Sequence, residues 1–258
     1  MKISVVMQSY LGEYPGARTN PEMKFIRAVY SMIGQSDPNW ELIIAADGCK
    51  ITERLYKEHF QHYSNIKFFM VEKPENTLMG EEKYHRGKPR AVAVKNATGD
   101  WISYLDSDDV YIKDAIKTLR DIIVRSLKIN NNLKCLLNNC VFENDFELVK
   151  WKKWNKIKKE GKLDNIDFSN EKNGDVLKID GLDGNWVPMS FRNKNGETKV
   201  PLGTYSLIHK KGYPSWEWGD TTEEGEDGAF IRPMLKEGFT GIFETPIYIR
   251  CHGVGWDL

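Results

Sequence analysis

The sequence predicts an α/β fold with a mainly parallel central sheet flanked by helices. Apolar runs of strand length alternate with segments of helical periodicity through the first half of the chain. The strand-length runs are almost continuously apolar, which is typical of strands buried on both faces of a parallel sheet. Two of these runs end directly at aspartates, Asp47 and Asp106. In such a fold the ligand crevice lies at the carboxyl ends of the strands, so these acids are candidate site residues.

Each element of the first half has its own local signal. Residues 2–9 form the first apolar run, and Asn20 and Pro21 then supply an N-cap and a first helical residue. Gly34 ends that helix. We expect strands over residues 2–9, 40–46, 66–71 and 101–105, and helices over residues 21–33, 52–63 and 89–97.

The second half alternates less regularly. We expect a helix over residues 112–129, a strand over 135–142, a strand over 204–209, a helix over 226–236 and a strand pair over 241–250. Between them, residues 150–173 are polar and rich in lysine, with Trp151 and Trp154 interleaved. A solvated face is the favoured interpretation of this stretch, and a basic aromatic patch for an anionic acceptor is the alternative.

Composition excludes several classes of protein. The chain has 258 residues, with 37 Lys plus Arg against 37 Asp plus Glu, so no global positive charge favours nucleic-acid binding. No apolar run reaches the length of a membrane span, and the start has no signal-peptide layout. The four cysteines have no CxxC spacing. We expect a cytoplasmic protein, with peripheral attachment to an inner membrane left open.

The strongest chemical signal is the acidic cluster Asp106-Ser107-Asp108-Asp109, which follows a hydrophobic strand. Carboxylates this close repel each other unless a positive charge lies among them. Mg²⁺ or Mn²⁺ binds through one or two carboxylates plus substrate phosphates, so the cluster predicts a divalent metal site. An Asp-rich turn that caps the next helix is the structural alternative.

Several segments together resemble the family 2 glycosyltransferases of the GT-A fold. The matching segments are the opening strand 3–10, the S-x-x-x-Q segment 31–35, the second strand 41–49, the stretch 87–102, the DXD-like 105–109 and the ED motif Glu226-Asp227. The first acid of the usual Asp-Asp-Gly-Ser is Ala46 here, and the Q-x-x-R-W motif of processive synthases is absent. The resemblance implies one GT-A domain over 1–258, with a nucleotide-binding half (1–110) and a smaller, mixed, acceptor-binding half (111–258).

The resemblance also implies roles for individual residues. Asp47 would accept from the ring N–H of the base, and Ser9 and Tyr10 would pack on the nucleoside. Arg90, with Lys88, would neutralise phosphate charge or touch the base. A turn aspartate and an exposed helix-start cation are the structural alternatives for Asp47 and Arg90.

The resemblance also implies metal ligands and a catalytic base. Asp108 and His252 would ligate Mn²⁺ or Mg²⁺, and Asp106 would hold the ribose or sugar, with a metal contact of its own. Asp227 would be the catalytic base of a single displacement with inversion. Trp216-Glu217-Trp218-Gly219 would shape the acceptor pocket or pack in the core.

The predicted function is transfer of a sugar from a nucleotide-sugar donor, with a UDP-sugar favoured, to a hydroxyl acceptor such as a glycan or lipid-linked saccharide in polysaccharide biosynthesis. Two alternatives remain. A nucleotidyltransferase uses a related sheet, but the Gly-rich basic loop that it normally has after strand one is missing from residues 8–13. A non-catalytic carbohydrate-binding or protein-binding module on the same scaffold is the other.

Overall fold

The structure is a computed structural model of the whole chain. It describes residues 1–13, 20–72 and 87–143, and in the second half residues 186–188, 191–192, 198–199, 207–214, 218, 230, 231, 234 and 239–250. Within these residues no helix is both long and apolar enough to cross a membrane.

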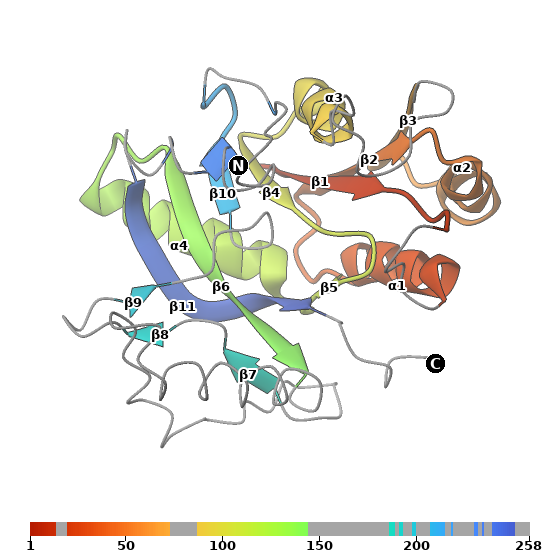
Figure 1. The fold of residues 1–258 in the computed structure, drawn as a ribbon. Coiled ribbons are helices and arrows are strands. Elements are labelled where there is room, and N and C mark those ends of the chain that lie inside the picture. Colours follow the sequence, from red (N-terminus) through yellow and green to blue (C-terminus); the bar gives the residue numbers. More distant parts are fainter. Residues whose placement is uncertain are drawn as a thin grey trace, which may run out of the picture.

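The first half alternates strands and helices as predicted (Figure 1). Its elements are β1 (Ile3–Ser9), α1 (Pro21–Ile33), β2 (Trp40–Asp47), α2 (Lys50–Leu55), the π-helix η1 (Tyr56–Phe60), β3 (Ile66–Val71), α3 (Lys88–Asn96), β4 (Trp101–Tyr104) and β5 (Val110–Tyr111). The second half contributes α4 (Ala115–Ile129), β6 (Cys135–Glu143), β7 (Trp186–Pro188), β8 (Phe191–Arg192), β9 (Thr198–Lys199), β10 (Leu207–Lys210) and β11 (Phe239–Arg250).

The strands form one mixed sheet in the order β3-β2-β1-β4-β10-β6-β11-β5, with β7 beside β6. The pairs β3–β2, β2–β1 and β1–β4 are parallel, whereas β10 runs antiparallel to both β4 and β6. This confirms the mainly parallel sheet in the first half and the mixed arrangement in the second. Because β2, β1 and β4 are neighbours and parallel, their carboxyl ends meet at one edge, which we call the carboxyl edge.

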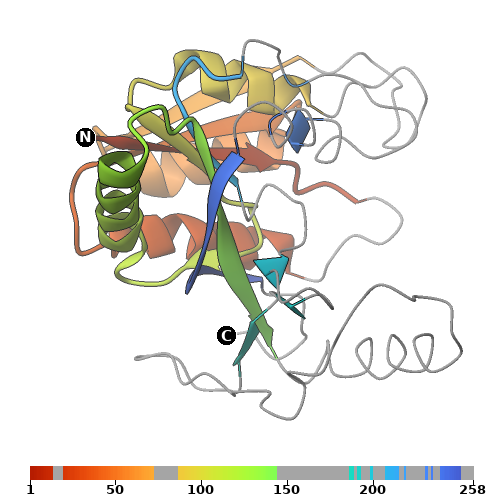
Figure 2. The ribbon, with the colours of Figure 1, turned by 90° about the vertical axis from the view of Figure 1, so that its left-hand side faces the viewer.

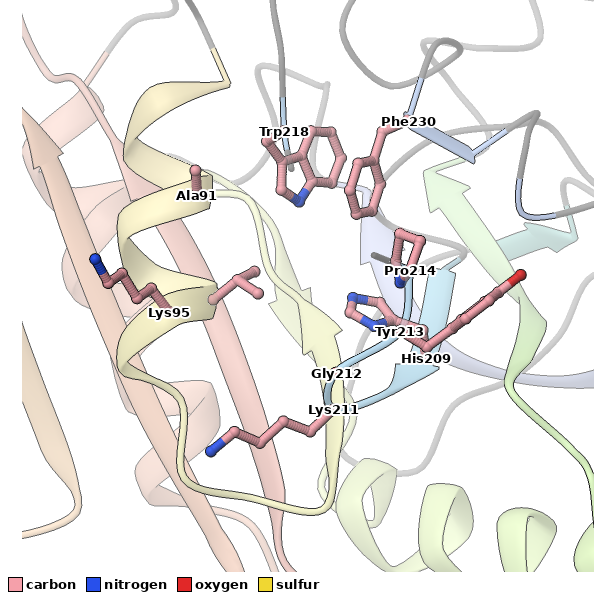
Figure 3. Close-up of a pocket in the computed structure, with 10 residues that line it drawn as sticks. Ala91, Lys95, His209, Lys211, Gly212, Tyr213, Pro214, Trp218 and Phe230 are labelled. Carbon is pink, nitrogen blue, oxygen red and sulfur yellow. The ribbon is translucent and has the colours of Figure 1, made fainter. Parts of the chain in front are cut away.

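Helices cover both faces of the sheet (Figures 1 and 2). One core joins α1, α2 and α4 to β1 and β2, and it includes Phe25, Leu55 and Ile116. The opposite core joins α3 to Trp218, Phe230 and neighbouring residues of the second half (Figure 3). Every residue of β2 is buried, as its continuous apolar run predicts.

The predictions for several elements need correction. The helix expected over 52–63 is a short α-helix followed by a π-helix, and the helix expected from residue 112 begins at Ala115 after the short strand β5. Asn20 precedes α1 in the left-handed conformation, with φ of 50°, and its side chain makes no capping hydrogen bond. Most of the expected 226–236 helix, and all of the lysine-rich 150–173 segment, lie outside the described residues.

The strand pair expected over 241–250 is wrong, because these residues belong to the single strand β11. β11 lies parallel to β6, and its register shifts between Phe239 and Ile242 and again between Phe243 and Tyr248. The second irregularity spans Pro246, which has no N–H to donate and is tolerated where the ladder is interrupted.

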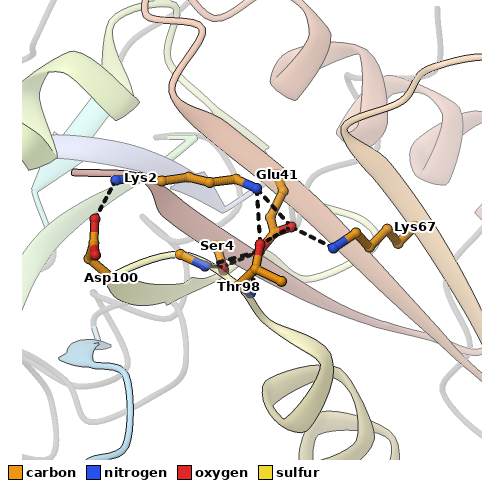
Figure 4. Close-up of polar contacts among 7 residues, drawn as sticks. Lys2, Ser4, Glu41, Lys67, Thr98 and Asp100 are labelled. Atoms are coloured by element: carbon orange, nitrogen blue, oxygen red, sulfur yellow. Dashed lines mark hydrogen bonds and ion pairs between the residues drawn. The ribbon is translucent and has the colours of Figure 1, made fainter.

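At the opposite, amino edge of the sheet, the buried carboxylate of Glu41 joins four segments of chain (Figure 4). Ser4 Oγ of β1 donates to it at 2.6 Å, and Lys67 Nζ of β3 at 2.9 Å. Lys2 Nζ donates at 3.0 Å, and the turn before β4 donates through the Thr98 backbone N–H at 2.5 Å. Burial raises the pKa of Glu41, but these hydrogen bonds outweigh burial and hold the pKa well below its usual range.

Gly99 permits this close approach of the turn to β1. A Cβ at position 99 would lie 2.7 Å from Ser4 N and 2.8 Å from the Lys2 carbonyl oxygen. Its N–H donates to Ser4 Oγ at 2.8 Å, and the lack of space for a Cβ favours glycine here.

We predict that Glu41→Gln lowers the free energy of unfolding by about 3 kcal/mol at pH 7, because the buried donors lose their charged acceptor. Urea unfolding measures this change. A depressed pKa stabilises the fold above the unfolded-state value of about 4.3, and this stabilisation is lost as pH falls towards the folded-state pKa. The difference in the free energy of unfolding between wild type and Glu41→Gln should therefore be smaller at pH 3 than at pH 7.

Glu58→Gln is the matched control, because the Glu58 side chain is 48% exposed and its contacts with Arg54 and His59 lie at the surface. Its effect should stay within about 0.5 kcal/mol. If the difference in the free energy of unfolding between wild type and Glu41→Gln stays constant from pH 7 to pH 3, the ionised carboxylate does not have the role given to it.

Candidate active site

The carboxyl edge collects predicted residues from three neighbouring strands. β1 ends at Ser9, β2 at Asp47 and β4 at Tyr104, directly before Leu105 and Asp106. The strand order reverses direction between β1 and β4, because the chain runs outward from β1 to β3 and then returns to β4. Ligands of doubly wound sheets bind at such a switch point.

Asp47 is the buried last residue of β2, with 1% of its surface exposed. Gly48 follows with φ of 60°, a left-handed turn that glycine adopts without strain, and its N–H donates to the carbonyls of Ala46 and Val71. The turn predicted from Asp-Gly is therefore present, and it places Asp47 at the crevice.

Ser9 and Tyr10 take different positions at the end of β1. Ser9 is buried, and its hydroxyl shares a 2.9 Å hydrogen bond with Thr52 Oγ1 of α2. Tyr10 is partly exposed, and its ring lies so close to Gly12 that a Cβ there would approach the ring at 2.7 Å. Of the two residues, only Tyr10 has exposed surface on which a nucleoside could pack.

The three acids after β4 have distinct environments. Asp106 and Asp108 are partly exposed, whereas Asp109 is 1% exposed. Tyr248 Oη of β11 donates to Asp109 Oδ2 at 2.9 Å and accepts from the Asp106 N–H at 3.0 Å. Asp109 is therefore a structural acid, and Asp106 and Asp108 remain as candidate ligands.

The Tyr248 phenol that contacts this loop stays protonated. Burial raises the pKa of Tyr248 well above its ordinary value, and the charges of Asp106, Asp109 and Asp108 raise it further. The phenol therefore stays protonated and keeps its donor for Asp109. The N–H of Asp109 also donates to the Asp106 carbonyl at 3.1 Å, which closes the turn.

Arg27 of α1 supports the same loop from the face of the sheet that α1 covers. Its guanidinium donates to the Asp108 carbonyl at 2.9 Å. Neither Arg27 nor Tyr248 was predicted from sequence. Tyr248 reaches Asp109 across 139 residues, and no local pattern identifies such a contact.

Arg90 and Lys88 both lie in the first turn of α3, but only Arg90 faces the site. Lys88 is exposed, whereas Arg90 is 8% exposed and its guanidinium lies 3.5 Å from Asp106 Oδ1. The Arg90 guanidinium also lies over the ring of Trp218, 5.2 Å from its centroid. The structure therefore brings together a predicted phosphate-binding cation and a predicted acid.

Trp218 borders a pocket of about 410 Å³ on the α3 face of the sheet (Figure 3). Ala91 and Val94 of α3 form one wall, and His209, Tyr213 and Phe230 line the other parts. The volume falls in the range of small-molecule sites. His209 is fully buried, and burial lowers its pKa to about 4, so the imidazole is neutral at physiological pH.

Two predicted residues lie outside the described part of the chain, the base Asp227 and the metal ligand His252. So do Trp216, Glu217 and Gly219 of the predicted acceptor-pocket segment. Among the described residues no group of three or more His, Cys, Asp or Glu is arranged to hold a metal ion. Two partly exposed carboxylates at a strand end nevertheless suit a hard cation that takes its other ligands from substrate phosphates.

Comparison with known proteins agrees with this geometry. Residues 20–130 match the model of the family described as Glycosyl transferase family 2. The chain is 26% identical over 147 residues to the UDP-Glc:alpha-D-GlcNAc-diphosphoundecaprenol beta-1,3-glucosyltransferase WfgD of Escherichia coli, covering 57% of this chain and 49% of that protein. It is 29% identical over 119 residues to the poly(ribitol-phosphate) beta-N-acetylglucosaminyltransferase TarS of Staphylococcus aureus, covering 45% of this chain and 18% of that one.

A solved structure of residues 1–349 of S. aureus TarS with UDP-GlcNAc superimposes with a TM-score of 0.59 at 17% identity, covering 98% of this chain and 59% of that one. This likeness shows the fold. The chain spans about half or less of the length of these curated relatives. The resemblance to family 2 glycosyltransferases and the GT-A fold are confirmed.

We predict that Tyr248→Phe lowers the free energy of unfolding by about 1–3 kcal/mol, because it leaves the buried Asp109 carboxylate and the Asp106 N–H without this partner. Urea unfolding at pH 7 measures the change. Tyr56→Phe is the control, since the Tyr56 hydroxyl makes only a long 3.4 Å hydrogen bond to the Ile66 carbonyl. Equal effects of the two variants would show that Tyr248 does not hold the acidic loop.

Proposed function

Because the chain carries a glycosyltransferase family 2 domain and has the GT-A fold, we propose that it transfers a sugar from a nucleotide-sugar donor to a hydroxyl acceptor. The supporting observation is the carboxyl edge, where β2 ends at Asp47 and where Asp106, after β4, lies 3.5 Å from Arg90 of α3. A cation facing partly exposed acids is an arrangement that suits a diphosphate and a divalent metal together.

The donor assignment rests on the residues around β1, β2 and α3. Asp47 accepts the ring N–H of the base at the end of β2, and Tyr10 packs on the nucleoside. Arg90 neutralises phosphate charge, with Lys88 at the outer side of the same helical turn. A UDP-sugar is favoured, since UDP-Glc is named for the E. coli relative and UDP-GlcNAc for the TarS complex.

Asp106 and Asp108 would hold Mn²⁺ or Mg²⁺, with His252 as a third ligand from the end of the chain. When bound, such a cation supplies positive charge to the departing nucleoside diphosphate. Asp109 takes no part as a ligand, because Tyr248 engages its carboxylate. Its role is to keep Asp106 and Asp108 in one conformation.

Asp227 acts as the base of a single inverting displacement. It accepts the proton of the acceptor hydroxyl as that oxygen attacks the anomeric carbon, while the bond to the nucleoside diphosphate breaks. A nearby carboxylate also stabilises the oxocarbenium-like sugar electrostatically. The acceptor is a glycan or a lipid-linked saccharide, in keeping with the diphosphoundecaprenol-linked sugar named for the E. coli relative.

A panel of nucleotide sugars, incubated with the full chain and MnCl₂, tests the reaction type. We expect release of nucleoside diphosphate from a UDP-sugar, and loss of this activity in EDTA with recovery on added Mn²⁺. Release of pyrophosphate from a nucleoside triphosphate would assign a nucleotidyltransferase. Binding of saccharide with no turnover of any donor would assign a binding module.

We predict that Asp227→Asn lowers kcat by about 10²–10⁴-fold, because the acceptor hydroxyl loses its base. UDP affinity, measured by calorimetry, should change less than about twofold, because the base does not contact the nucleotide in this assignment. Asp121→Asn, on the exposed face of α4, is the control for removal of one negative charge. Near-normal kcat in a folded Asp227→Asn protein would exclude Asp227 as the base.

A further inference from the structure

We infer that Tyr104 and Trp218 are positioning residues that hold Arg90 at the donor phosphates. This inference rests on the proposed function, since it assigns Arg90 to the donor. Tyr104 is the last residue of β4, and Trp218 comes from the second half of the chain. In this role both residues act through Arg90.

Arg90 contacts both the acidic loop and Trp218. The 3.5 Å separation between Arg90 Nη2 and Asp106 Oδ1 is longer than the roughly 2.7–2.9 Å of a strong charge-assisted hydrogen bond. The planar guanidinium lies 5.2 Å from the centroid of the Trp218 ring, within the distance of a cation–π interaction. Because Arg90 is 8% exposed, this ring replaces solvent at the guanidinium.

Trp218 is in turn held at two places. Its ring stacks on Phe230 with the centroids 3.8 Å apart and the planes 14° apart. Its Nε1–H donates to Tyr104 Oη at 3.1 Å, and Trp218 is 5% exposed. Stacking fixes the plane of the indole, and the hydrogen bond fixes its rotation within that plane.

The hydrogen bonds of this cluster have a defined direction. The Lys210 carbonyl can only accept, so the 3.1 Å contact places a proton on His209 Nδ1. In a neutral imidazole Nε2 is then an acceptor, and Tyr104 Oη donates to it at 2.7 Å. Tyr104 Oη thus uses its proton for His209 and a lone pair for Trp218, so one hydroxyl orients both rings.

This cluster joins the two halves of the chain. Arg90 and Tyr104 belong to the first half, and Trp218 precedes the predicted base Asp227 by nine residues. Figure 3 shows Trp218 and Phe230 packed beside α3, which carries Arg90, with His209 beneath them. We therefore expect loss of the Tyr104 hydroxyl to change the position of Arg90 and to weaken donor binding.

A double-mutant cycle of Tyr104→Phe and Arg90→Gln tests the inference. UDP binding is measured by calorimetry with MnCl₂, and urea unfolding is measured without ligand. We expect Tyr104→Phe to raise the Kd for UDP about fivefold in the wild-type background and less than about twofold in the Arg90→Gln background. In sugar transfer, Tyr104→Phe should raise KM for the donor and leave kcat within about twofold.

A purely structural role for Tyr104 would give the same Kd factor in both backgrounds, and that result would overturn the inference. Tyr30→Phe, at a tyrosine 49% exposed on α1, is the control for loss of a hydroxyl. If Tyr104→Phe does not fold, Trp218→Phe enters the same cycle, because it keeps a ring against Phe230 and lacks the Nε1–H.

The two proposals fail in different ways. If wild-type protein neither binds UDP nor turns over any nucleotide sugar, the proposed function is wrong, and the unfolding cycle then decides whether Tyr104 positions Arg90. A coupling of about threefold or more in the unfolding constant supports the positioning. Additive effects on unfolding overturn it even if sugar transfer is observed.

Discussion

The carboxylate of Glu41 is the contact on which the rest of the structure depends. It accepts from both β1 and β3 and from the turn that leads into β4, and it lies on β2, so one buried charge joins the four parallel strands. Side chains alternate along a strand, so a register slip of one residue would turn a site residue to the opposite face. By fixing register at the amino edge, Glu41 fixes which residues of β1, β2 and β4 meet at the carboxyl edge.

At the carboxyl edge, the fold separates three neighbouring acids that the sequence presents as one cluster. Like charges this close repel each other, and a buried acid needs a hydrogen-bond donor. The fold meets this need for Asp109 with a tyrosine from β11. Asp106 faces the cation of α3 instead, and Asp108 is held through its backbone by Arg27. Asp109 therefore has a structural role in this loop, and metal binding by Asp106 and Asp108 stays a proposal.

Features that depend on local sequence signals were predicted, whereas features that depend on contacts between distant residues were not. Continuous apolar runs and a proline at a helix start identify β1, β2, β3 and α1 within a residue or two, because those signals are local. The π-helix after α2 and the single irregular strand β11 depend on packing and on pairing with distant strands, and both were missed. At the site, motif residues such as Asp47 and Asp106 were placed correctly at the carboxyl edge. Tyr248 and Arg27 were not found, because their contacts with the acidic loop span 139 and 81 residues.

Long-range aromatic contacts also explain how an arginine can lie beside an acidic loop with little exposed surface. A buried guanidinium loses hydration, and the contacts with Asp106 and Trp218 offset part of that loss. The face of Trp218 provides a further attraction that does not depend on a directional hydrogen bond. Lysine would not suit this position equally well, because its ammonium is a compact point charge that is strongly hydrated and has no planar face. Arg90 therefore suits this position better than a lysine would, because its planar guanidinium lies over the Trp218 ring.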